Sequence, residues 1–132
     1  MVFLDTAPVI YFVEAHPDWG PKAAARLTAL QAAGEVLAVS DLVRMECLVK
    51  PLKAGDTALV ADFGTFFTSP GVSVLPVTAA VCDRAALIRA AHNFKPLDSL
   101  HLAAAVVHGC TRFLTNDTRL GRFPDIPVDV LT

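Results

Sequence analysis

The sequence lacks any apolar run near the roughly 18–20 residues that cross a bilayer, so no membrane-spanning helix is expected. Its first residues, Met1–Asp5, lack the basic stretch of a secretory signal peptide. Cysteine is scarce: Cys47, Cys82 and Cys110 stand in apolar surroundings without CxxC spacing. This usage argues against a disulfide framework or a zinc site and predicts reduced core thiols in a cytoplasmic protein.

Charged residues are also few, at 18% of the chain against about 25% in ordinary domains, while 54% of residues are hydrophobic. This balance excludes intrinsic disorder. The length of 132 residues fits a single domain spanning residues 1–132. With a mean hydropathy of +0.51, the fold cannot hide all of its apolar surface internally. We therefore expect a partner, either a second copy or a different protein, to cover part of it.

Short apolar runs alternate with segments of helical character. The runs predict strands at Val2–Asp5, Val36–Val39, Val72–Leu75, Arg112–Thr115 and Val128–Val130. The intervening segments predict helices at about Thr6–Glu14, Lys22–Ala33, Asp41–Val49, Thr57–Phe67, Thr78–Ala91 and Leu97–His108. Thr6 is placed to cap the first helix, and Pro51 is expected to stop the third. The alternation predicts a three-layer α/β/α fold with a mostly parallel sheet of four or five strands.

Two acidic residues follow predicted strands directly, at the sheet edge where parallel folds build their sites. Asp5 ends the first strand, and Asp117 follows the fourth. Because Thr6 can serve as the cap, Asp5 is available for a functional role, although a turn or cap residue is the alternative. For Asp117, the alternative is a cap of a short helical turn near Thr118–Leu120.

Glu46 falls in the predicted helix after the second strand, with Leu42, Val43 and Val49 on the same helical face. A lone carboxylate there is costly unless it is paired or bound to a cation. Helical side chains lean toward the amino terminus, which points Glu46 back at the strand end. An ordinary helical ion pair with Lys50 accounts for Glu46 equally well.

Asp98 lies in the first turn of the most apolar predicted helix, and His101 follows one turn later on the same face. The helix dipole alone favours an acid at that place. His101 is interpreted as a hydrogen-bonded core histidine rather than a ligand.

Four acids therefore converge on one edge of the predicted sheet. Such oxygen ligands, without His or Cys among them, suit Mg²⁺ or Mn²⁺, which can orient a water for attack on phosphorus. Without these four, the chain keeps 9 acidic and 11 basic residues. The remaining surface is thus mildly basic, in contrast to the net charge of −2. Candidate contacts to a nucleic-acid backbone, each alternatively an ordinary surface residue, are Lys22, Arg26, Arg44, Lys50, Arg89, Lys95 and Arg119.

The sequence resembles the PIN-domain nucleases, and more narrowly the VapC-type toxins of prokaryotic toxin–antitoxin pairs. The matching stretches are Phe3–Thr6 with Ile10 and Tyr11, Val43–Glu46, Pro96–Ala105 and Leu114–Asp117. The resemblance extends over essentially the whole chain, and the four motifs occur in the family's order.

This resemblance implies a metal-dependent endoribonuclease whose acidic quartet is Asp5, Glu46, Asp98 and Asp117. Asp5 and Asp98 match the positions credited with direct metal contact, and the other two complete the site or position the water. Thr6, Thr115 and Asn116 match supporting positions. Family members usually form homodimers, and an antitoxin inhibits them by occupying the active-site groove. Some relatives carry a further acid where Asn116 and Thr118 stand here, so the number of metal ions stays open.

Two other functions are alternatives to the nuclease. One is a non-catalytic PIN-like module that binds RNA or protein. The other is a small phosphotransfer or phosphatase domain with Asp5 as nucleophile, although the second Asp that such sites need is replaced by Ala7. No glycine-rich phosphate-binding motif supports a nucleotide enzyme.

Overall fold

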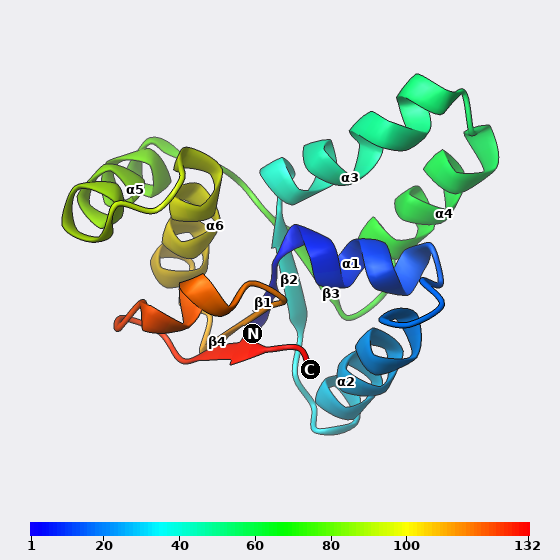
Figure 1. The fold of residues 1–132 in the computed structure, drawn as a ribbon, viewed down its shortest axis with the longest axis horizontal. Coiled ribbons are helices and arrows are strands. Elements are labelled where there is room, and N and C mark those ends of the chain that lie inside the picture. Colours follow the sequence, from blue (N-terminus) through cyan, green and yellow to red (C-terminus); the bar gives the residue numbers. More distant parts are fainter.

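The computed structural model describes all 132 residues (Figure 1). The strands are β1 (Val2–Leu4), β2 (Leu37–Ser40), β3 (Val72–Leu75), β4 (Arg112–Thr115) and β5 (Val128–Val130). The helices are α1 (Thr6–Val13), α2 (Gly20–Ala32), α3 (Asp41–Ala54), α4 (Thr57–Phe67), α5 (Ala79–His92) and α6 (Pro96–Val107), with a 3-10 helix η1 at Thr118–Arg122. The predicted alternation of strands and helices is confirmed.

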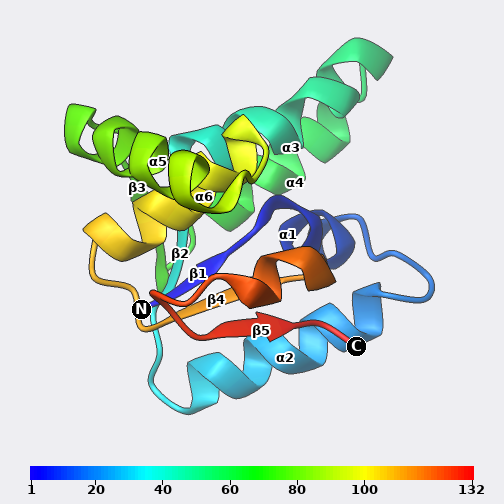
Figure 2. The same cartoon turned by 60° about the vertical axis from the view of Figure 1, so that its left-hand side comes forward.

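The five strands form one sheet in the order β3-β2-β1-β4-β5, and every neighbouring pair is parallel. Helices α5 and α6 lie on one side of the sheet, and α1, α2 and α4 lie on the other (Figures 1 and 2). This is the three-layer α/β/α arrangement. Because all strands run the same way, their carboxyl ends meet at one edge.

Strand β1 occupies the centre of the sheet, so its residues are covered on both faces. Phe3 is fully buried and stacks on Phe113 of β4 with ring centroids 5.3 Å apart. Truncation of Phe3 to Ala is expected to cost about 3–5 kcal/mol, because it removes a large side chain from a closed core. This packing fixes the end of β1 next to the end of β4, where the backbone N–H of Asp5 donates to the carbonyl of Leu114 at 2.9 Å.

Helix α3 differs from its prediction, because it continues past Pro51 to Ala54. Proline there costs one backbone hydrogen bond without stopping the helix. The helix ends instead at Gly55, whose φ of 65° lies in the left-handed region that glycine adopts without strain.

The cysteine prediction holds for two of the three residues. Cys47 and Cys110 are buried, whereas Cys82 is exposed on α5, so the prediction of a core position was wrong for Cys82. Burial raises the pKa of Cys47 to about 12, which makes this thiol unreactive. No helix combines the length and apolar character needed to cross a membrane.

Candidate functional site

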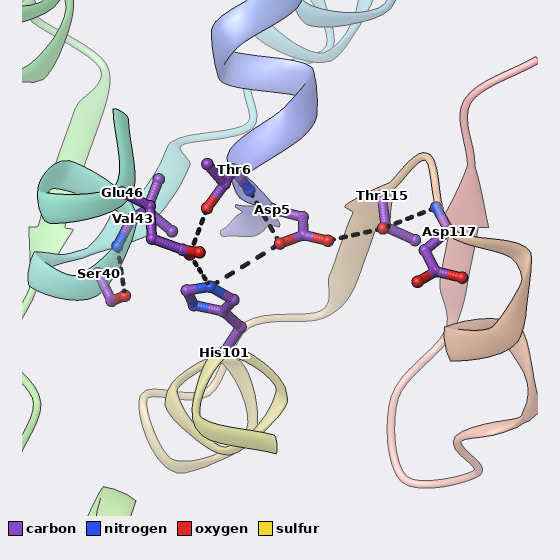
Figure 3. A network of polar contacts seen from close by, with 8 residues as sticks. All are labelled: Asp5, Thr6, Ser40, Val43, Glu46, His101, Thr115 and Asp117. Carbon is purple, nitrogen blue, oxygen red and sulfur yellow. Dashed lines mark hydrogen bonds and ion pairs between the residues drawn. The ribbon is translucent and has the colours of Figure 1, made fainter. Parts of the chain in front are cut away.

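Asp5 directly follows β1 and is almost fully buried, and both of its carboxylate oxygens accept hydrogen bonds (Figure 3). Oδ1 accepts a hydrogen bond from the backbone N–H of Thr6 at 2.9 Å, and Oδ2 accepts one from the hydroxyl of Thr115 at 2.7 Å. Asp5 itself is therefore the cap of α1, and the prediction that Thr6 takes this role was wrong. The cap position still directs the carboxylate to the sheet edge.

The side chain of Thr6 is free to act elsewhere because Asp5 caps the helix. Its hydroxyl donates to Oε1 of Glu46 at 2.8 Å, and Nε2 of His101 lies 2.6 Å from the same oxygen. Lys50 takes no part in these contacts and forms no ion pair, so the Glu46–Lys50 alternative was wrong. The hydrogen bond from His101 keeps the pKa of Glu46 below its ordinary value, against the opposing effect of burial.

His101 lies between the carboxylates of Asp5 and Glu46. Its Nε2 is 4.0 Å from Oδ1 of Asp5, and the side chain is only 2% exposed. Since the carboxylate of Glu46 can only accept, the short contact places the imidazole proton on Nε2. Nδ1 is buried with no partner. The sequence predicted a hydrogen-bonded core histidine at this position. The place of His101 one turn after Asp98 was the signal that its hydrogen-bond partner could be one of the acids, and that partner is Glu46.

Asp117 begins η1, and its backbone N–H donates to the hydroxyl of Thr115 at 3.1 Å. Its carboxylate faces Arg119, whose Nε lies 3.0 Å from Oδ1 and whose Nη2 lies 2.6 Å from Oδ2. Oδ1 also accepts from the backbone N–H of Arg119 at 2.9 Å, so the capping alternative holds as well. The Arg119 guanidinium lowers the pKa of Asp117.

Asp98 lies in the first turn of α6, as predicted. Burial raises the pKa of its carboxyl group, and the negative charges of Asp5 and Asp117 raise it further. His101 and Arg119 oppose this shift. The carboxyl group of Asp98 is thus affected by the acids that follow β1 and β4.

The supporting side chains divide into two groups. Thr6 and Thr115 contact the acids, as described above. Asn116 instead donates from its amide to the hydroxyl of Tyr11 at 2.7 Å, and so joins the β4–η1 turn to α1.

The geometry has one feature that bears directly on metal binding. No three His, Cys, Asp or Glu side chains converge closely enough to hold an ion without movement. The donor set nevertheless fits Mg²⁺ or Mn²⁺, because it consists of carboxylates, the oxygen ligands that these ions prefer. Burial, and then the negative charge of Asp5, raises the pKa of Asp98, so like charges repel one another here. A divalent cation would relieve that repulsion, provided that the side chains draw together.

A family model described as the PIN domain matches residues 2–126. None of the curated protein sequences compared with the chain matches it.

Solved structures share the fold. VapBC2 of Rickettsia felis, bound to a fragment of its promoter DNA, matches with a TM-score of 0.82 at 18% identity, covering 100% of both chains. A toxin–antitoxin complex of Klebsiella pneumoniae matches with a TM-score of 0.79 at 18% identity, covering 100% of this chain and 98% of that one. The sarcin-ricin loop cleaving toxin VapC20 of Mycobacterium tuberculosis matches with a TM-score of 0.66 at 22% identity, covering 86% of this chain and 87% of that one.

Proposed function

Because the chain belongs to the PIN domain family, we propose that it is a metal-dependent endoribonuclease and the toxin of a toxin–antitoxin pair. The observation that carries this proposal is the hydrogen-bonded network at the sheet edge. It connects Asp5, Glu46 and Asp117 (Figure 3). Asp98, in the first turn of α6, is affected by the charges of Asp5 and Asp117.

In this proposal, Asp5 and Asp98 are direct ligands of Mg²⁺ or Mn²⁺, and Glu46 and Asp117 complete the site. When bound there, the cation supplies Lewis-acid stabilisation of the phosphodiester and a water of lowered pKa. Asp117 joins the set by turning away from Arg119, with which it is paired in the structure.

The remaining residues of the network position these carboxylates. The hydroxyl of Thr115 holds Oδ2 of Asp5, and Thr6 and His101 hold Oε1 of Glu46. Because the contact with His101 lowers the pKa of Glu46, that carboxylate stays ionised at neutral pH and is able to accept a proton or orient a water.

The proposed partners are an antitoxin, a second copy of the chain and an RNA, all in the cytoplasm. Two of the solved structures described above are toxin–antitoxin complexes, which supports the antitoxin. Large apolar side chains are exposed on α3 and α5, where Leu52 is 62% exposed and Leu87 is 67% exposed. Such residues favour a covering protein.

The test is cleavage by the purified protein. It is expected to cut RNA with Mg²⁺ or Mn²⁺ and to stop with EDTA. Asp5→Asn is expected to reduce cleavage by more than about 100-fold, because losing a ligand should exceed the 10- to 100-fold typical of its supporting residues. Far-UV circular dichroism serves as the control for folding. Cleavage that survives complete chelation, or full turnover by Asp5→Asn, would contradict the proposal.

A non-catalytic binding module is the second candidate, and one observation favours it: no three metal-binding side chains converge in the structure. Titration with Mn²⁺ separates the two functions. The nuclease is expected to bind Mn²⁺ and lose that binding in Asp98→Asn, whereas a binding module would show no difference. The phosphotransfer alternative is disfavoured by the family match and by the hydrogen bonds on both oxygens of Asp5.

A further inference from the structure

A small hollow of about 70 Å³ lies beside Asp98, between the start of α6 and η1. Its lining residues are Asn93, Phe94, Lys95, Asp98, Arg119, Leu120 and Arg122. Three of the chain's 11 basic residues thus come together at this one place. Asp98 belongs both to this hollow and to the acidic site.

Arg122 is held in place by neutral groups. Its Nη2 donates to the carbonyl of His92 at 2.8 Å, and its guanidinium carbon lies 4.2 Å from the ring centroid of Phe94. Neither Arg122 nor Lys95 forms an ion pair with a carboxylate. Their charges are therefore available to an anion, and that of Arg122 is also oriented.

Arg119 has a partner, Asp117, but its side chain is 63% exposed. Exposed ion pairs contribute little to stability, because water screens them and the side chains lose freedom. Arg119 can therefore change partner at small cost. An anion in the hollow competes with Asp117 for the guanidinium, and the carboxylate thus released is one of the proposed metal ligands.

Four of the other five arginines differ, because each already pairs with a carboxylate. The exception, Arg89, donates to the backbone carbonyl of Phe94. Arg26 and Arg112 both pair with Asp129, and Arg84 pairs with Asp125. The larger hollow of about 620 Å³ beside α2 is lined by Lys22 and Arg26 but also by Asp129. The hollow beside Asp98 thus has the more accessible positive charge, although it is smaller.

We propose that Lys95, Arg119 and Arg122 form a subsite for one phosphate of an RNA strand, next to the phosphate that is cut. This inference rests on the proposed nuclease function and names how that site holds its substrate. Binding at this subsite does not depend on the RNA sequence, since the three side chains contact a backbone phosphate and no base edge. It places the strand against Asp98, so that the neighbouring phosphodiester reaches the acidic residues.

The test measures binding of a fluorescent single-stranded RNA of mixed sequence to full-length Asp5→Asn protein in Mg²⁺ at several salt concentrations. In this background, Lys95→Ala/Arg122→Ala is expected to weaken binding roughly 10-fold and to reduce the salt slope by about 0.7, the value for one lost phosphate contact on a single strand. Adding Arg119→Ala is expected to weaken binding further.

The control is Lys53→Ala/Arg84→Ala, which removes the same formal charge from α3 and α5, where Lys53 is unpaired and Arg84 is paired with Asp125. It is expected to change affinity less than about twofold, since surface substitutions away from a site have small effects. Arg122→Lys keeps the charge, and it separates loss of binding from loss of folding if Arg122→Ala is unstable. It is expected to retain most of the salt slope.

The outcomes separate this inference from the proposed function. If wild-type protein cleaves RNA with metal and Lys95→Ala/Arg122→Ala binds RNA like the control pair, the subsite is overturned and the nuclease stands. The subsite is equally overturned if the variants keep RNA affinity but lose binding to a protein partner. Failure of Asp5→Asn to reduce cleavage contradicts the nuclease itself, whatever the RNA affinities are.

Discussion

The acidic edge of the sheet has two halves that are held in different ways. In the hydrogen-bonded half, Asp5 and Glu46 accept hydrogen bonds from neighbouring hydroxyls, an imidazole and a backbone N–H. In the charge-paired half, Asp117 faces the exposed Arg119, and the pKa of Asp98 is raised by burial and by the charge of Asp5. Hydrogen bonds from packed neighbours fix a position, whereas an ion pair with an exposed partner leaves it adjustable. The hydrogen-bonded half is therefore preorganised, and the charge-paired half is the part that can rearrange around an ion or a substrate.

The largest expected effect comes from the charge-paired half. Asp98→Asn is expected to reduce Mn²⁺-dependent cleavage by more than about 100-fold, because a charged ligand is lost. Without metal, the same variant is expected to be more stable than wild type at pH 7. Because the pKa of Asp98 is raised in the folded state, its ionisation destabilises the fold as pH rises above the unfolded pKa.

Thermal unfolding at pH 3 and pH 7, with EDTA and with Mn²⁺, checks this prediction. The stability advantage of Asp98→Asn is expected to shrink at pH 3, where the wild-type carboxyl is protonated in both states, and to reverse with Mn²⁺. If Asp98→Asn is no more stable than wild type at pH 7 in EDTA, ionisation of Asp98 does not destabilise the folded protein.

The next effect tests the preorganised half. His101→Leu removes one of the two donors to Glu46 but also removes the buried, unpartnered Nδ1. We therefore expect the folded protein to keep near-normal stability and to lose about 10- to 100-fold in Mn²⁺ affinity, the usual cost of a lost supporting residue. Isothermal titration with Mn²⁺ measures the affinity. His101→Gln, which can donate to Glu46 from its amide, is expected to restore part of it; a histidine that only fills the core would change stability alone.

A smaller effect is expected from Thr115→Val. The hydroxyl of Thr115 donates to Asp5 and accepts from the backbone N–H of Asp117, so it is the one group that connects the two halves. Its loss is expected to cost about 1–3 kcal/mol of unfolding free energy, because buried partners are left unpaired. Urea unfolding measures this cost, and Thr65→Val, at an exposed position of α4, serves as the control. Equal effects of the two substitutions would contradict the connecting role.

The smallest effect is expected from Lys50→Ala. Lys50 has no contact with Glu46, so its removal is expected to leave Mn²⁺ affinity within about twofold of wild type. Titration alongside His101→Leu gives the comparison directly. A loss as large as that of His101→Leu would mean that Lys50, and not the imidazole, governs Glu46.

Local patterns in the sequence predicted the scaffold well. The bounds of α4, β3, β4 and β5 agree residue for residue with the prediction, since each segment is delimited by capping residues, glycine or proline. The error at Pro51 arose because a proline costs one hydrogen bond, and the rest of α3 outweighs that cost.

The partners of the acids were harder to predict. The cap of α1 is Asp5 and not Thr6, the predicted cap. Thr6 instead donates a hydrogen bond to Glu46, which lies 40 positions further along the chain. The contact of His101 with Glu46 spans 55 positions. Sequence spacing predicts which residues share a helix face, but not which rotamer each selects once several donors meet at one edge.

The central place of β1 has a consequence for synthesis of the chain. Val2 pairs on one side with Leu37 and on the other with Arg112, so the first strand acquires its second neighbour only after β2, β3 and the intervening helices have been made. Asp5 and Asp117 meet only when that pairing has formed. A nascent polypeptide that stops before β4 therefore has an incomplete acidic cluster, and the proposed toxic activity cannot begin until that strand has been made and paired.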